Sequence, residues 1–295
     1  MKVAVFIAGP YRYADQVHRS LERLFPTIDY SAFYFIWKED LGNKVRNSSN
    51  NDAFPLASDK KTKAFITADP YSVDDFKNSI GTKTNSGSSI NATMGMFFSM
   101  NALCQYLEAL PDADEYTHIV RLRTDCLVFD SLEKYINSSS SNVVVSNNQR
   151  VSSSWISDHI MIAPKASFFL FWKHNSMKEI YGLYSKGKRN PEKTLGYIAQ
   201  KESVNVLPVL NRNVDYHIVY SPVKSDEPSW LYEFQSTKTV AELFDNIEGL
   251  VKQNRQEISQ FEEKESKFQS GLHDHLSIKE KVKHHILKRL PFLRR

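Results

Sequence analysis

The segment from His118 to Val128 is the part of the chain whose residue types and spacing point most directly to chemistry. An apolar run leads into Arg121, Arg123 and Asp125, and a second apolar run begins at Cys126. Strands of open α/β sheets present polar groups to ligands at their carboxyl ends. A carboxylate suits Mg²⁺ or Mn²⁺, and such ions commonly bridge carboxylates and substrate phosphates. The pattern predicts an anion or metal site at Asp125; the alternative is a strand whose Asp caps the next turn.

A second candidate site follows the first apolar run, Val3–Ala8. Gly9 and Pro10 close that run, and Tyr11 and Arg12 come next. Glycine lets a backbone approach a ligand closely, and a guanidinium group can bind a phosphate through two parallel hydrogen bonds. The loop from Ala8 to Arg12 is therefore a candidate for the phosphates of a nucleotide.

Aromatic residues near the first two apolar runs are candidates for stacking on a nucleoside. They are Tyr11, in the loop just described, and Trp37, at the end of the second run, Ala32–Trp37. The carboxyl ends of neighbouring parallel strands lie at one edge of a sheet, so the two rings are expected near each other.

Three later residues are candidates for proton transfer or for its support. Asp158 comes just before a late predicted strand, where a carboxylate can take a proton from a bound hydroxyl group; the alternative is a loop carboxylate that caps backbone amides. His159 is expected on the opposite face of that strand, in a supporting role. Glu192 lies in the first turn of a helix opened by Pro191, where both residue types are favoured. It reads first as an acid at a helix N-terminus, and the alternative is a residue that supports the substrate.

The composition is that of a soluble or peripheral globular protein. The chain has 295 residues, 41% of them hydrophobic, and a formal charge of +4. A near-neutral body argues against a nucleic-acid-binding surface. Cys104 and Cys126 are the two cysteines and have no CxxC spacing, so neither a zinc site nor a disulfide framework is expected, and a reducing cytoplasm fits. The first apolar run is too short for a signal peptide.

The order of elements predicts an α/β fold with a Rossmann-like, mostly parallel sheet flanked by helices. The chain opens as strand, helix and strand. Most of residues 38–91 reads as surface loop, with short elements at about residues 63–66 and 73–80. The later strands are expected at 118–128, 143–146, 159–163, 204–210 and 215–219, and the helices at 13–25, 92–110, 166–184 and from 191.

Residues 236–295 differ from the domain expected over residues 1–235. Residues 239–270 form an amphipathic helical pattern that could pair two copies of the chain. The segment Lys279–Arg295 holds seven Lys or Arg residues and one acidic residue, with apolar residues every fourth position. We expect a basic amphipathic helix that binds the anionic inner face of the cytoplasmic membrane; the alternative is a solvated, charged terminus.

The ordered set of motifs over about residues 1–220 resembles bacterial surface-polysaccharide glycosyltransferases with a type A fold, such as WavE-like lipopolysaccharide synthesis proteins and related capsule transferases. The motifs are Gly9–Arg12, Phe33–Trp37, a Met- and Phe-rich helix, Arg121-x-Arg123-x-Asp125, Ser157–His159 and Pro191-Glu192. The resemblance implies transfer of a sugar, most simply a hexose, from a nucleotide-sugar donor to a growing polysaccharide or a lipid-linked oligosaccharide.

The resemblance also implies a divalent cation, Mg²⁺ or Mn²⁺, with Asp125 as its ligand and Asp125 and Asp158 as catalytic residues. Enzymes of this type usually carry Asp-x-Asp on the metal strand, but Arg123 replaces the first Asp here. Either Asp125 and the donor diphosphate hold the ion, or Arg121 and Arg123 replace part of its charge.

Two other functions remain open from the sequence. A catalytically inactive, transferase-like binding or scaffold protein would also explain the missing first Asp. A nucleotidyltransferase could use a similar sheet, but that chemistry commonly needs two carboxylates for two metal ions, and only Asp125 is well placed.

Overall fold

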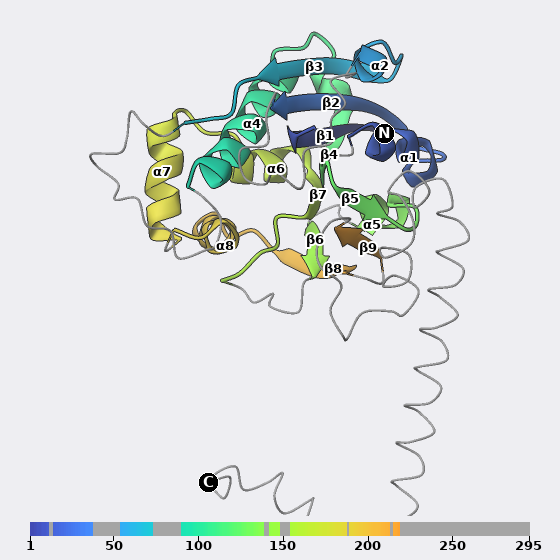
Figure 1. Ribbon diagram of the computed structural model, residues 1–295. Helices are drawn as coiled ribbons and strands as arrows, with labels where there is room; N and C mark the ends of the chain where they lie inside the picture. The colour runs from blue at the N-terminus through green and yellow to red at the C-terminus, as the bar shows by residue number, and fades with distance from the viewer. Residues whose placement is uncertain are drawn as a thin grey trace, which may run out of the picture.

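The computed structural model describes most of the first 218 residues of the chain (Figure 1). The described residues are 1–11, 14–37, 54–72, 90–138, 142–147, 154–187, 189–212 and 215–218. Arg12, the predicted helix at 239–270 and the basic tail Lys279–Arg295 lie outside them. The expectations placed on these segments therefore stay predictions.

A seven-stranded sheet forms the centre of the described chain. Its strands are β1 (Lys2–Pro10), β2 (Asp29–Trp37), β3 (Thr62–Ala68), β4 (Tyr116–Arg123), β6 (Val143–Asn147), β7 (Ile160–Pro164) and β8 (Val206–Asn211), in the order β3-β2-β1-β4-β7-β6-β8. β7 is antiparallel to both of its neighbours, and all other neighbouring strands of this sheet pair in parallel. The prediction of a Rossmann-like, mostly parallel sheet is confirmed.

Six strands of the sheet end at the same edge, which we call the carboxyl edge. β1 to β4 are parallel, and the two antiparallel pairings through β7 give β6 and β8 the same direction. β7 starts at this edge, because Ile160 pairs with Leu122 near the end of β4. Residues that follow β1 or β4 therefore meet residues that precede β7.

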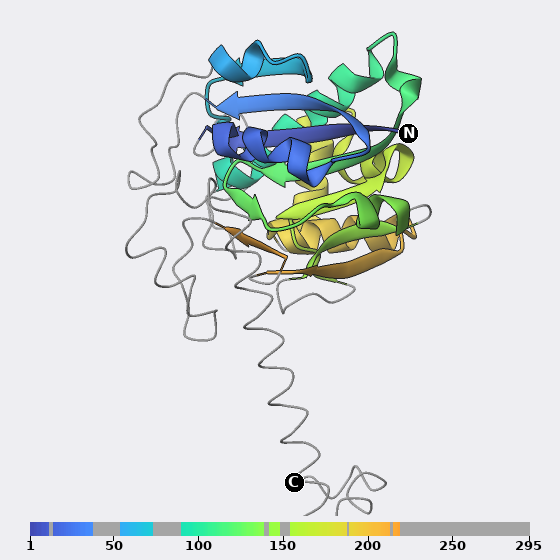
Figure 2. The same ribbon diagram turned by 90° about the vertical axis from the view of Figure 1, so that its right-hand side faces the viewer.

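Helices cover both faces of the sheet (Figures 1 and 2), and α1 lies in front of the strands in Figure 2. Side chains alternate along a strand, so neighbours such as Ile119 and Val120 enter opposite cores. One core packs under α4 (Ile90–Glu108), α6 (Lys165–Trp172), α7 (Met177–Lys186) and α8 (Pro191–Lys201). The other packs under α1 (Ala14–Leu24), α5 (Glu133–Ser138) and a two-stranded sheet of β5 (Cys126–Val128) and β9 (Tyr216–Ile218).

Within residues 38–91, most of which was expected to be surface loop with a short element at about residues 63–66, the structure has a strand of the main sheet. β3 pairs in parallel with the second half of β2 and follows the short helix α2 (Phe54–Ala57). Only Ala64 of this edge strand is buried. Because an edge strand has one neighbour and stays partly exposed, its sequence carries a weak apolar pattern.

The single helix expected at residues 166–184 is two helices, α6 and α7. The break is set by Ser176, whose side chain accepts a hydrogen bond of 3.2 Å from the N–H of Glu179. Serine at this N-terminal capping position favours the start of a helix. The apolar pattern continues on both sides of the break, and therefore it did not reveal the interruption.

None of the helices in the described ranges combines the length and apolarity needed to cross a bilayer. Cys104 and Cys126 are buried free thiols, and burial raises the pKa of both. Buried thiols with raised pKa values are poor nucleophiles, so the two cysteines serve packing.

Candidate active site

Arg121 and Arg123 lie at the end of β4 and share one face of the sheet, because side chains two residues apart on a strand point the same way. The guanidinium carbon of Arg121 lies 5.1 Å from the centroid of the Trp172 ring on α6. Arg121 is only 3% exposed, whereas the side chain of Arg123 is 25% exposed. The pair therefore brings one buried and one accessible cation to the carboxyl edge.

The Arg121 guanidinium is a buried cation with unused hydrogen-bond donors. Burial lowers its pKa to about 10, and the charge of Asp158 opposes this shift, so it stays protonated at neutral pH. Nη2 lies 3.6 Å from Oδ2 of Asp158. Nε and Nη1 are buried and have no hydrogen-bond partner within the described part of the chain. Leaving such donors unsatisfied is costly, and an anionic ligand is the kind of partner that satisfies them.

Asp125 lies in the turn between β4 and β5, where it binds Arg123. Nε of Arg123 donates a hydrogen bond of 2.9 Å to Oδ1, and Nη2 donates one of 3.1 Å to Oδ2. Asp125 is 0% exposed. A two-pronged ion pair of this kind fixes the orientation of both groups, so Asp125 holds Arg123 and the turn.

The described residues do not fit the divalent cation that the resemblance implies. Mg²⁺ keeps several of its waters when a protein binds it, so a ligating carboxylate must be accessible. Asp125 has no exposed surface, and both of its oxygens accept hydrogen bonds from Arg123. The described ranges also contain no group of three or more His, Cys, Asp or Glu side chains placed to hold a metal ion.

Asp158 lies just before β7 and faces both arginines. Its Oδ2 is 3.6 Å from Nη2 of Arg121 and 3.8 Å from Nη1 of Arg123. Burial alone would raise the pKa of this carboxyl, but the two guanidinium charges bring it below its usual range. Asp158 is therefore ionised at neutral pH, and a low pKa makes it a weak proton acceptor.

His159 turns to the opposite face of the sheet, as strand alternation predicts. Its Nδ1 lies 2.9 Å from the hydroxyl of Tyr216, while its Nε2 is 4.0 Å from Oδ1 of Asp158. Burial lowers the pKa of the imidazole to about 4, so His159 is neutral at pH 7. Nearby, Ser146 donates a hydrogen bond of 2.6 Å to Ser157. These contacts fix the segment that carries Asp158.

Glu192 brings a third carboxyl group to this region from the first turn of α8. The helix start is set by Asn190, whose side chain accepts a hydrogen bond of 2.8 Å from the N–H of Lys193. The N–H of Ile156 donates to the carbonyl of Glu192 at 3.1 Å. Burial, followed by the charge of Asp158, raises the pKa of Glu192 to about 7. Its Oε2 is buried and has no hydrogen-bond partner among the described residues.

The close contact between α8 and the segment before β7 sets the position of Asp158 relative to Glu192. A Cβ atom on Gly196 would lie 2.4 Å from the carbonyl carbon of Ser154 and 2.5 Å from its oxygen. Backbone atoms cannot move aside by a rotamer change, so only glycine allows this approach.

Gly196→Ala is therefore expected to destabilise the protein by about 1–3 kcal/mol, through overpacking against a backbone. Thermal unfolding followed by circular dichroism measures the effect. Gly182→Ala in α7 is the matched control and should be neutral or stabilising, because no atom of the described residues lies within 4 Å of a Cβ atom there. Equal melting temperatures for the two variants would contradict the close contact.

Residues 8–11, the described part of the predicted phosphate-binding loop, lie at the carboxyl edge beside β4. Gly9 has a φ of 136°, a backbone angle that residues with a side chain rarely adopt. A Cβ atom added to Gly9 would lie 3.6 Å from Oγ1 of Thr124. Ala8 is in register with Arg123. Tyr11 is partly buried and packs against the core on the α1 side. Ala8 and Arg123 are thus neighbours across the pairing of β1 and β4.

Trp37 lies in the core. It is 8% exposed, and its Nε1 donates a hydrogen bond of 2.8 Å to Ser99 on α4. A Cβ atom on Gly95 would lie 2.2 Å from the Trp37 ring, so the ring fills the space over that glycine. With so little ring surface exposed, Trp37 is a poor stacking platform, and Tyr11 is the remaining candidate for the nucleoside.

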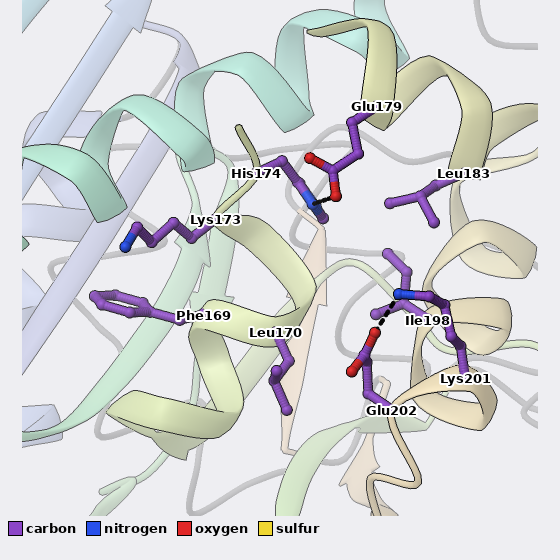
Figure 3. A pocket seen from close by; sticks show the side chains of 9 residues that line it. All are labelled: Phe169, Leu170, Lys173, His174, Glu179, Leu183, Ile198, Lys201 and Glu202. Carbon is purple, nitrogen blue, oxygen red and sulfur yellow. Dashed lines mark hydrogen bonds and ion pairs between the residues drawn. The ribbon is translucent and has the colours of Figure 1, made fainter. Parts of the chain in front are cut away.

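A hollow between α6, α7 and α8 is separate from this cluster (Figure 3). Leu170, Leu183 and Ile198 line it, and Lys201 stands at its side. Lys201 ends α8, whereas Glu192 is in its first turn; nine residues of helix rise span about 14 Å. None of the site residues predicted from the sequence lines this hollow.

The structure thus brings together polar groups from three segments that are far apart in the sequence. The sequence predicted Arg121, Arg123, Asp158 and Glu192, and the contacts described above place them in one region. It did not predict the parts played by Ser146 and Tyr216. Ser146 lies within an apolar strand and Tyr216 within a three-residue strand, so only the pairing of distant strands brings them near His159.

No protein-family model and no curated protein sequence matches the chain. Among solved structures, the galactosyltransferase LgtC in complex with donor and acceptor sugar analogues is 13% identical and covers 83% of this chain and 95% of its own, with a TM-score of 0.45. Mouse xyloside xylosyltransferase 1, in its apo form, is 12% identical and covers 71% and 85%, with a TM-score of 0.38.

A putative nucleotide-diphospho-sugar transferase from Desulfovibrio desulfuricans G20 is 10% identical and covers 88% of this chain and 97% of its own, again with a TM-score of 0.38. All three solved proteins are described as sugar transferases. Such low identities and TM-scores do not decide what this chain does, which must follow from its own residues.

Proposed function

We propose that the chain is a glycosyltransferase that moves a sugar from a nucleotide-sugar donor to a saccharide or lipid-linked acceptor. The observation that carries the proposal is the contact of Arg121 and Arg123 with Asp158 at the carboxyl edge, with Glu192 tied to the same segment. Sugar transfer needs positive charge for the leaving diphosphate and a carboxylate for the acceptor hydroxyl. This region of the chain holds both.

We assign the stabilisation of the leaving diphosphate to Arg121 and Arg123. When the bond between the anomeric carbon and the diphosphate breaks, negative charge develops on the phosphate oxygen, and fixed cations stabilise it. Arg123 is in register with Ala8, next to Gly9, where the absence of a side chain lets the protein backbone approach the donor closely. Tyr11 of the same loop is the candidate for the nucleoside.

We assign the removal of the proton from the acceptor hydroxyl to Glu192. In a transfer that inverts the configuration, a carboxylate takes the hydroxyl proton, and it works best with a pKa near the operating pH. Asp158 was the first candidate from the sequence, but two arginines lower its pKa. The pKa of Glu192 is about 7 and its Oε2 has no hydrogen-bond partner in the described ranges. We therefore assign the proton transfer to Glu192 and the alignment of the arginines to Asp158.

A panel of nucleotide sugars tests this function. Thermal shift should identify a donor that raises the melting temperature of the wild-type chain, and mass spectrometry of that mixture with lipid-linked saccharides should show the transferred sugar. Loss of transfer but not of folding in Arg123→Lys would support the assigned role. A nucleotide that binds without any transfer in the full acceptor panel would favour the inactive scaffold.

We also propose the finer role of a hexosyltransferase in the synthesis of capsule or lipopolysaccharide at the inner face of a bacterial cytoplasmic membrane. The order of sequence motifs supports this role, and so does the basic segment Lys279–Arg295. A lipid-linked acceptor would be presented at that surface.

The full-length chain is expected to sediment with anionic liposomes at low salt. Each cationic side chain near an anionic surface contributes about 1 kcal/mol, and burial of the apolar residues adds to this. A chain that ends at Gly271 should stay in the supernatant but still act on a soluble acceptor analogue. Equal sedimentation of the two chains would show that the tail is not the membrane anchor.

A further inference from the structure

We infer that Asp125 is a positioning residue for Arg123, and that Arg121 and Arg123 bind the donor diphosphate without a divalent cation held by the protein. This inference rests on the proposed function and specifies how the donor is held. It departs from the metal role that the sequence resemblance implies for Asp125.

The first step of the argument is the state of Asp125. Its two oxygens accept hydrogen bonds of 2.9 Å and 3.1 Å from one guanidinium group, and the residue is 0% exposed. A hydrated cation could reach this carboxylate only by breaking the pair with Arg123 and opening the turn. The carboxylate that should ligate the metal is therefore already used to orient a cation of the protein.

The second step concerns Arg121. This side chain is 3% exposed, and its Nε and Nη1 have no hydrogen-bond partner among the described residues. Buried donors in native structures nearly always find partners. A phosphate offers several acceptor oxygens and a negative charge, so it suits a guanidinium group better than a neutral ligand does.

The third step concerns the long ion pairs between Asp158 and the two arginines. Its distances of 3.6 Å to Arg121 and 3.8 Å to Arg123 exceed the usual length of a hydrogen bond. A phosphate oxygen that approaches Arg121 would therefore not have to displace a well-formed hydrogen bond between Arg121 and Asp158. Asp125 makes two short hydrogen bonds with Arg123, whereas Asp158 makes only long ion pairs with the two arginines, so the two carboxylates have different roles.

The test is calorimetric titration of the full chain with UDP, GDP, CDP and ADP, in excess EDTA and in saturating MgCl₂ or MnCl₂. We expect one nucleoside diphosphate to bind with affinities that agree within about threefold in all three conditions. Arg121→Lys should weaken this binding by about tenfold, as the loss of one forked contact predicts. Arg19→Ala, an exposed residue of α1, is the control and should bind as the wild type does.

A loss of binding of about tenfold or more in EDTA, restored by either metal, would overturn the inference but leave the proposed function standing. Protein-bound Mn²⁺, detected by electron paramagnetic resonance in the wild type and absent in Asp125→Asn, would overturn it in the same way. Failure of every diphosphate to bind in every condition would overturn the proposed function together with the inference.

Discussion

Asp125→Ala is expected to destabilise the protein by about 3–5 kcal/mol in buffers that contain EDTA. The reason is that the substitution removes the buried partner of the Arg123 guanidinium and leaves a poorly compensated charge. Chemical denaturation of the purified variant measures the loss. Transfer by the fraction that stays folded should also fall, because Arg123 would lose the contact that aims it at the carboxyl edge.

A double-mutant cycle separates this ion pair from other effects of the substitution. Arg123→Met and Asp125→Ala should each destabilise the chain, and the double variant should cost less than the sum of the two by roughly 1–3 kcal/mol, because the residues are in direct contact. A metal ligand at an open edge would behave differently. If Asp125 were such a ligand, Asp125→Ala would change the stability little in EDTA, and added Mg²⁺ would stabilise the wild type but not the variant.

The general fold was predictable from the sequence because its strands are buried on both faces. Continuous apolar runs such as Val3–Ala8 and Ala32–Trp37 come from central strands, and the helix between them shows a clear apolar stripe. β3 and the break between α6 and α7 were not predictable in the same way. An edge strand is half exposed, and a capped break inside an apolar stretch leaves the hydrophobic pattern unchanged.

The candidate site was predictable only as a set of residue types. The sequence identified Arg121, Arg123, Asp125 and Asp158, but it could not tell which carboxylate forms the close pair with Arg123 and which lies between the two arginines at longer distances. That distinction depends on the turn after β4, which places Asp125 against the side chain two residues before it. In the same way, the lowered pKa of Asp158 and the raised pKa of Glu192 depend on contacts between distant segments.

Glu192→Gln is expected to lower kcat by about a hundredfold or more at pH 7, with little change in nucleotide affinity, if Glu192 accepts the acceptor proton. Wild-type kcat should fall as the pH drops below about 7, the pKa of this group, because the protonated carboxyl cannot act as a base. Steady-state rates across this range measure both effects. Asp158→Asn is the comparison; it should weaken the alignment of the arginines and leave the pKa of the rate profile near or below that of the wild type.

The stability of the same variant tests the raised pKa of Glu192 independently of the rate. The pKa of Glu192 is higher in the folded chain, about 7, than in the unfolded chain. Its contribution to stability is therefore fully present below the unfolded pKa and is lost as the pH rises through about 7. At pH 8 the folded chain holds a buried, partly desolvated carboxylate, so Glu192→Gln should be more stable than the wild type there by roughly 1–2 kcal/mol. The gain should vanish at about pH 4. A Gln variant that is less stable than the wild type at pH 8 would contradict the raised pKa of Glu192. A variant that keeps the wild-type rate and pH profile would exclude Glu192 as the proton acceptor.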